Sequence, residues 1–181
     1  MFTMTSVSSG LLIASETLLS IAEKITSNVL KESGKMNRKV VSLVSRVRED
    51  VEMLGKLVKA LGEKAQLLQG GGEGIKLAPY LYAYALKNQV VFAKASPRRF
   101  MVSFSPENRE VWVSAGRFKA LFSPGRIKVI SKGFSVEFDP YNRGDYVEKY
   151  NDIKFLVDEL ETVVNKKLIQ SLNVKLGKIS V

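Results

Sequence analysis

The sequence predicts an α+β protein: an N-terminal antiparallel helical hairpin, coiled-coil-like in its pattern, followed by an antiparallel β-meander packed by a long C-terminal helix. Three observations support this class. Apolar residues recur at helical spacing as far as residue 68, glycines crowd residues 70–74, and apolar and polar residues alternate from residue 89 onward. The 181 residues suffice for one full core, and a hydrophobic share of 45% is typical of a folded protein.

Residues 11–32 predict an amphipathic first helix. Ser8 or Ser9 offers a cap at its start, and Ser33-Gly34 ends it. The apolar stripe consists of Leu11, Leu18, Ala22, Ile25 and Val29. Because the connection SGKMN is short, we expect the second helix to return alongside the first as an antiparallel hairpin.

The second helix has the most regular pattern in the chain, with apolar spacings of four and three over four heptads. Such a seam has two interpretations: it packs on the first helix and the sheet within one chain, or it joins a homo-oligomer or protein partner through residues 40–68. The oligomer-interface hypothesis names Val40, Val44, Val47, Val51, Leu54, Val58 and Leu61.

The segment QGGGEGIK interrupts the helical pattern. Four glycines within five positions favour a flexible hinge, which divides the chain into a hairpin (1–69), a hinge (70–76) and a sheet domain (77–181). A phosphate-binding loop is the alternative, but the segment lacks the Lys-Ser/Thr ending of such loops and follows no predicted strand.

Residues 77–88, LAPYLYAYALKN, fit two patterns. Tyr80, Tyr82 and Tyr84 alternate as they would in a strand, whereas Pro79 and the Ala/Leu content favour a short helix. We expect a helix here. The tyrosines are interpreted as a partly buried wall, with base stacking as the alternative.

From residue 89 the apolar period changes to two. Strands are expected at 89–94, 99–105, 110–114, 117–122, 126–131 and 134–138, with turn residues between them. Their short connections predict an antiparallel meander. A last helix, expected from about residue 145 to 170, has the apolar stripe Tyr146, Tyr150, Ile153, Val157, Leu160 and Val164.

Alternation assigns the strand residues to two faces. The core face, expected to pack on the C-terminal helix, collects Phe100, Val102, Phe104, Val111, Val113, Phe118, Ala120, Phe122, Ile127, Val129, Phe134, Val136 and Phe138. The opposite face, called the second face below, collects Arg99, Met101, Ser103, Trp112, Arg117, Lys119, Leu121, Arg126, Lys128 and Ile130. It therefore mixes five cations with the single Trp of the chain.

This mixture predicts binding of nucleic acid, DNA or RNA, with single strands favoured, because cations neutralise phosphates while an aromatic ring stacks on a base. The net charge of +10 is consistent with such a partner. The predicted nucleic-acid site comprises Arg98, Arg99, Trp112, Arg117, Lys119, Arg126, Lys128 and Lys132. The alternative is a structural or adaptor protein, in which the hairpin buries the second face or both serve protein–protein contacts.

Missing residue types exclude several reactions. The chain has no Cys and no His, which excludes disulfides, thiolate or imidazole metal sites and Ser-His-Asp triads. The acidic residues Glu137, Asp139, Asp145, Glu148 and Asp152 do not match a nuclease spacing, and we interpret them as favourable charges at a helix start. We expect a non-enzymatic nucleic-acid-binding or nucleoprotein-assembly subunit without a cofactor or metal.

The apolar N-terminal run GLLIASETLLSIA does not have the properties of a targeting or membrane segment. It is interrupted by Glu16, is too short to span a bilayer, and follows no Lys or Arg. We therefore expect a cytoplasmic protein with no membrane partner.

Overall fold

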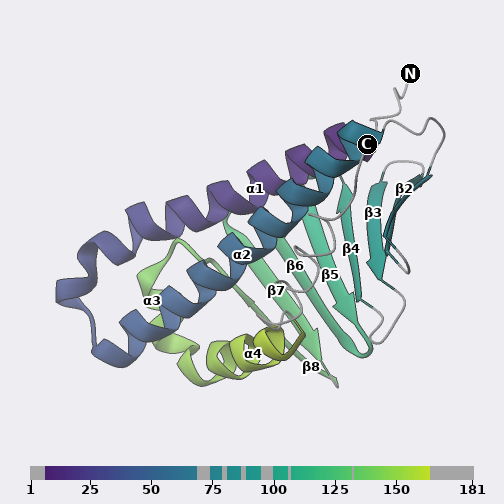
Figure 1. The fold of residues 1–181 in the computed structure, drawn as a ribbon. Coiled ribbons are helices and arrows are strands. Elements are labelled where there is room, and N and C mark those ends of the chain that lie inside the picture. Colours follow the sequence, from purple (N-terminus) through teal and green to yellow (C-terminus); the bar gives the residue numbers. More distant parts are fainter. Residues whose placement is uncertain are drawn as a thin grey trace.

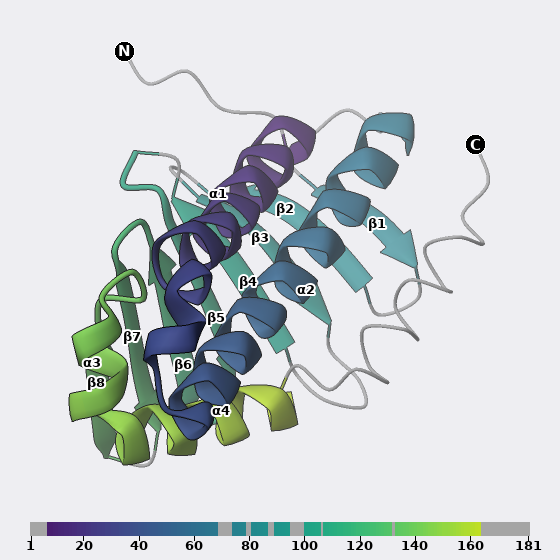
Figure 2. The same ribbon diagram turned by 90° about the vertical axis from the view of Figure 1, so that its left-hand side faces the viewer.

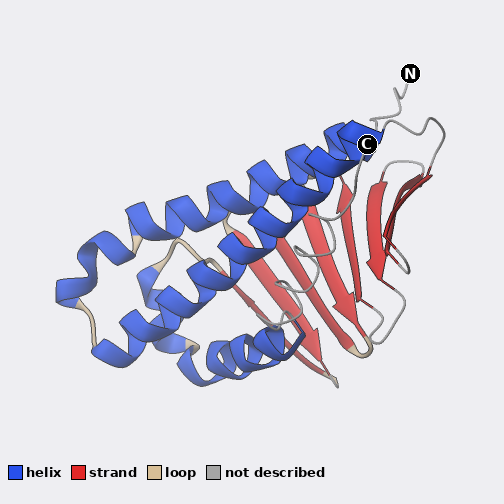
Figure 3. Ribbon diagram, viewed as in Figure 1, coloured by secondary structure: helices blue, strands red, loops and turns tan. Residues whose placement is uncertain are grey.

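Two layers make up the fold, an antiparallel sheet and a set of helices against one of its faces (Figures 1 and 3). The structure, a computed structural model, describes residues 7–68, 74–78, 81–86, 89–94, 100–105, 107–131 and 133–163. Its elements are α1 (Val7–Asn28), the 3₁₀ helix η1 (Leu30–Lys35), α2 (Arg38–Leu68), β1 (Gly74–Ala78), β2 (Leu81–Leu86), β3 (Gln89–Lys94), β4 (Phe100–Ser105), β5 (Glu110–Ala115), β6 (Phe118–Ser123), β7 (Arg126–Ser131), β8 (Phe134–Phe138), α3 (Arg143–Glu148) and α4 (Tyr150–Val163). The predicted α+β class, with its helical hairpin and meander, is confirmed.

The hairpin consists of α1 and α2, which lie side by side and are joined by η1 (Figure 1). At the start of α2, the Asn37 side-chain oxygen accepts a hydrogen bond from the Lys39 backbone N–H at 2.8 Å, which satisfies one of the free donors of the first turn. The predicted apolar stripe of α1 is buried, since its five members are 0–4% exposed. The predicted apolar stripe and the hairpin are therefore confirmed. The predicted helix bounds are not, because α1 starts at Val7 and ends at Asn28, which places Ser8 and Ser9 inside the helix and not at its cap.

Two glycines let the helices of the hairpin approach closely. A Cβ atom at Gly55 would lie 2.9 Å from Cγ of Leu19, and one at Gly62 would lie 3.0 Å from Cγ of Leu12. Both pairs are seven residues apart along their helices, so the contact repeats after two turns. Each leucine of α1 thus sits directly on a position of α2 that has no side chain.

The seam of α2 is an internal contact. The residues proposed as an oligomer interface, Val40, Val44, Val47, Val51, Leu54, Val58 and Leu61, are 0–7% exposed within the single chain. Leu43 and Leu57, outside the seam, are also buried, so the apolar stripe is wider than an a/d seam and serves more than one neighbour. These side chains have almost no exposed surface to offer a second subunit, which favours the intrachain interpretation.

The eight strands follow chain order in the sheet, each antiparallel to the next. Strands β3 to β8 match the six predicted strands, with bounds that differ by at most one residue. Gly125 and Gly133, in the turns before β7 and β8, have φ angles of 76° and 79°, a left-handed backbone that glycine adopts without steric strain. The predicted meander is therefore confirmed, with a glycine in each of these two turns.

The predicted helix over residues 77–88 is wrong. The segment contributes to strands β1 and β2, which pair with each other and, through β2, with β3. Tyr82 and Tyr84 lie in β2, so their alternation is the correct signal, and pairing on both sides outweighs the local helix propensity. Strand β1 also includes the last three residues of the predicted hinge, whereas residues 70–73 lie outside the described part of the chain.

The predicted last helix is divided into α3 and α4. The chain leaves helical geometry at Lys149, with φ −107° and ψ 26°, and the Lys149 ammonium donates a hydrogen bond to the Glu137 carbonyl oxygen at 2.8 Å. The stripe is otherwise confirmed, because Tyr146, Ile153, Val157 and Leu160 are 0–4% exposed. Tyr150 is partly buried against the same core, whereas Val164 and the predicted continuation to residue 170 lie outside the described residues.

The core face predicted from alternation is buried. Its described members are 0–7% exposed, apart from the partly buried Phe134, and they form one hydrophobic core with residues of α1, α2, α3 and α4. The side chain of Phe100 is outside the description. The hairpin and the C-terminal helices thus share one sheet face, where the sequence predicted the C-terminal helix alone.

A charged cluster joins α2 to α4. The Arg46 guanidinium donates hydrogen bonds to Asp158 at 2.6 Å and to both carboxylate oxygens of Glu161 at 2.9 and 3.0 Å. One turn further along α2, Asp50 is 6% exposed, and its Oδ2 has no hydrogen-bond partner among the described residues. Burial, followed by the negative charge of Glu161, raises the pKa of Asp50 to about 8.

Candidate nucleic-acid interface

The second face of the sheet points away from the helical hairpin. Figures 1 and 2 show α1 and α2 crossing one face, with α4 on the same side near β8. The strand residues in contact with these helices are those of the core face. Met101, on the second face, is 42% exposed. The hairpin therefore does not bury the second face, contrary to one of the two interpretations of the sequence.

The predicted nucleic-acid-binding residues that the structure describes lie together. Trp112 is on β5, Lys119 on β6, and Arg126 and Lys128 on β7, while Arg117 is in the turn between β5 and β6. Arg117, Lys119 and Arg126 are exposed, and Trp112 and Lys128 are partly buried. The other three predicted residues, Arg98, Arg99 and Lys132, lie outside the described residues.

The strand register places Trp112 and Lys128 in one row across the sheet. From β4 to β8 the row consists of Ser103, Trp112, Leu121, Lys128 and Glu137. Neighbouring strands are about 4.8 Å apart, so the backbones at Trp112 and Lys128 are separated by roughly 10 Å. Leu121 between them is 2% exposed, although alternation assigns it to the second face. The Trp112 ring and the Lys128 ammonium therefore lie on either side of a buried leucine.

The cations form a diagonal line over β6 and β7. Lys119 is paired with Ile130 and Lys128 with Leu121, so the two lysines are one strand and one row apart. With a rise of about 3.4 Å per residue, successive positions in the order Arg117, Lys119, Lys128 and Arg126 are roughly 7–8 Å apart. Among the described residues, Lys119 and Lys128 have no ion pair. Neither ammonium is therefore neutralised by a direct ion pair in the described part of the chain.

Sequence reasoning missed the role of Glu137 on this face. Glu137 accepts an ion-paired hydrogen bond from Nε of Arg126 and lies directly opposite Lys128 in the sheet register. The signal is present in the sequence, because a connection of only two residues pairs Ser131 with Phe134, and the same register places Lys128 opposite Glu137. One predicted cation, Arg126, is therefore already neutralised.

Two other acidic residues between β8 and α4, Asp139 and Asp145, accept hydrogen bonds from the backbone. Asp145 Oδ2 accepts the Asp139 N–H at 2.8 Å, and Asp139 Oδ1 accepts the Tyr141 N–H at 2.9 Å. The Tyr146 hydroxyl, buried below them, donates to the Pro140 carbonyl oxygen at 2.7 Å. No cluster of acidic side chains suited to a metal ion occurs among the described residues. Asp145 therefore lies in the first turn of α3, as the helix-start interpretation expects, whereas Asp139 belongs to the segment before that helix.

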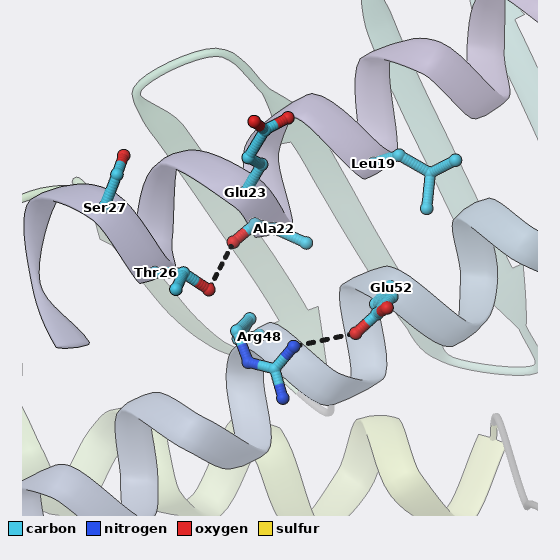
Figure 4. A pocket seen from close by; sticks show the side chains of 7 residues that line it. All are labelled: Leu19, Ala22, Glu23, Thr26, Ser27, Arg48 and Glu52. Carbon is cyan, nitrogen blue, oxygen red and sulfur yellow. Dashed lines mark hydrogen bonds and ion pairs between the residues drawn. The ribbon is translucent and has the colours of Figure 1, made fainter. Parts of the chain in front are cut away.

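A groove lies between the two helices of the hairpin (Figure 4). Its volume is about 420 Å³, and it is lined by Leu19, Ala22, Glu23, Thr26, Ser27, Arg48 and Glu52. Arg48 and Glu52 form an ion pair at 2.7 Å along one wall. Glu23 adds a carboxylate on the α1 side, so the groove combines an apolar floor at Leu19 and Ala22 with a polar, charged rim.

Comparisons with known proteins provide no relative from which a function could be transferred. No protein-family model, no curated protein and no solved structure matches the chain. Within the residues that the structure describes, no helix is long and apolar enough to cross a membrane. What the protein does must therefore be inferred from its own residues and their arrangement.

Proposed function

We propose that the protein binds single-stranded nucleic acid, without catalysing a reaction, through the second face of its sheet. The observation that carries this proposal is the combination of the partly exposed Trp112 with Lys119 and Lys128, which have no ion pair among the described residues, on the face that the hairpin leaves uncovered. Stacking on Trp112 requires an unpaired base, since the bases of a duplex already stack on each other. Single strands are therefore the favoured ligand.

Electrostatics supports the same partner. The chain has a net charge of +10, and four described cations lie along a line whose spacing suits successive phosphates of an extended strand. The second face also has anions, Glu110 on β5 and Glu137 on β8, so its charge is mixed at one border. We expect moderate, salt-dependent affinity with little dependence on base sequence.

Charge reversal at Lys119 and Lys128 tests the proposal. In the variant Lys119→Glu/Lys128→Glu, affinity for an oligothymidylate or oligouridylate should fall at least about tenfold, and the salt slope should flatten by about 1.4, because two phosphate contacts are lost. The matched control is Lys39→Glu/Lys59→Glu, which makes the same charge change at exposed positions of α2. If the control variant loses as much affinity for the oligonucleotide, the protein attracts nucleic acid through its net charge and not through the second face.

The aromatic part of the site is tested by Trp112→Ala. Loss of stacking should cost about 1–3 kcal/mol of single-strand affinity and leave the salt slope nearly unchanged. Fluorescence anisotropy at several salt concentrations and a melting curve on the same sample check this. A large drop in melting temperature with unchanged affinity would assign Trp112 to stability and contradict the stacking role.

The hairpin groove supports a second candidate function, that of a structural or adaptor protein. A second chain or another protein would fill the apolar floor at Leu19 and Ala22. Thr26→Arg places a long charged side chain at the exposed rim of the groove. Sedimentation velocity then shows whether the wild type self-associates and whether Thr26→Arg abolishes the association. If it does, and if the wild type does not bind single strands, the adaptor function is favoured over nucleic-acid binding.

A further inference from the structure

At the border of the second face, on β7 and β8, a cation of the predicted site is already paired with a carboxylate of the protein itself. The Glu137 carboxylate accepts from Nε of Arg126, and both side chains remain accessible, with 44% of Arg126 and 50% of Glu137 exposed. Lys128 lies opposite Glu137 on the neighbouring strand. Side chains opposite each other in antiparallel strands have Cβ atoms about 5 Å apart, so both cations are within reach of one anion.

We infer that Arg126 and Lys128 form a phosphate subsite of the second face, and that Glu137 occupies this subsite until a nucleic-acid strand displaces it. The inference rests on the proposed function and assigns an inhibitory residue to it. The carboxylate oxygens of Glu137 stand where phosphate oxygens would bind. A guanidinium recognises both groups through the same planar set of N–H donors.

The exchange is energetically accessible because the ion pair is exposed. Pairs of this kind contribute only about 0–1 kcal/mol, since water screens them and two long side chains must be ordered. Separating Arg126 from Glu137 therefore costs the fold little. The displaced carboxylate stays on the same face, however, and repels the incoming phosphate. Glu137 thus weakens binding twice, by competing for Arg126 and by its remaining charge.

The subsite continues the line of cations toward Trp112. Lys128 belongs both to the subsite and to the row that contains Trp112. A base stacked on Trp112 and a phosphate at Lys128 and Arg126 would lie on adjacent parts of one strand. Access to this end of the line depends on the position of the Glu137 side chain, which no other described residue holds through a hydrogen bond or ion pair.

The test is a gain of affinity in Glu137→Gln, which keeps the size of the side chain and removes its charge. Binding of a labelled oligothymidylate should tighten about three- to tenfold, and the salt slope should become steeper by about 0.7, because one more phosphate is neutralised. Glu148→Gln, at an exposed position of α3, is the control for the change in net charge. It should alter affinity much less.

A double-mutant cycle locates the effect at Arg126. If Glu137 masks Arg126, then Arg126→Gln should weaken binding more in the Glu137→Gln background than in the wild type. If the wild type binds and the affinities of Glu137→Gln and Glu148→Gln are equal, the inference is overturned. The proposed function is then unaffected. No binding by the wild type or by Glu137→Gln at low salt would overturn both. Binding by Glu137→Gln alone would support a masked subsite.

Discussion

Asp50→Asn should stabilise the protein by up to about 5 kcal/mol near pH 9 and leave its stability near pH 4 almost unchanged. The wild-type carboxyl is buried beside Glu161, and its pKa is raised from 3.8 to about 8. Asparagine has the same shape as the protonated acid and cannot ionise, so it removes the cost of burying a charge. An effect of this size is a substantial part of the stability of a small domain.

The direction of the pH dependence follows from proton binding. Between about pH 4 and pH 8 the folded wild type keeps a proton on Asp50 that the unfolded chain releases, so the free energy of unfolding decreases as the pH rises through this window. Below it both states are protonated, and the variant has no advantage. The charged groups that act on Asp50 are Arg46 and Glu49 on its own helix and Glu161 on α4.

Denaturant unfolding at several pH values checks the prediction. The control Glu16→Gln removes a carboxylate from an exposed position of α1 and should show no comparable pH-dependent gain. If Asp50→Asn destabilises the protein equally at pH 4 and pH 9, the ionised carboxylate is held by favourable contacts, and the raised pKa is contradicted.

The second large effect is expected at the close contact between α1 and α2. Gly55→Leu should destabilise the protein by about 3 kcal/mol, since a buried side chain must displace Leu19 from a well-packed interface. Gly55→Ala should cost about 1 kcal/mol, because its single methyl group clashes less and alanine favours the helix. The series therefore measures how tightly the helices are packed.

Gly34 provides the matched control for this series. It lies in η1, it is exposed, and a Cβ atom there would meet nothing within 4 Å. Gly34→Ala should change the free energy of unfolding by no more than about 0.5 kcal/mol. Thermal and denaturant unfolding of the three variants tests the comparison, and a neutral or stabilising Gly55→Leu would show that the helices separate without cost.

Most of the fold could be predicted because its signals are periodic and local. The apolar stripe that begins at Leu11 in α1, the heptads of α2 and the alternation after residue 89 each indicate one structure with one buried face. Residues 77–88 could not be assigned in this way. Pro79 and the alanines favour a helix locally, whereas β3 supplies the strand partner that decides the structure.

The candidate site was harder to predict than the fold because it depends on which layer covers which face. Alternation separates Val102 from Met101, but it does not say where the hairpin packs. The extra apolar residues Leu43 and Leu57 were the available sign that α2 has neighbours besides α1. The Arg126–Glu137 pair follows from hairpin register rather than from composition, so counting charges alone overestimated the free cations.

The sequential order of the strands has a consequence for folding kinetics. Every strand pairs with its neighbour in the chain, so β3 to β8 can zip together through short loops, each with a small closure entropy. The hairpin leaves the ribosome first, yet it can bury its apolar stripe only when the distant strands β4 to β6 are present. We therefore expect the sheet, including its second face, to form before the hairpin packs on the core face. This packing step should limit the folding rate.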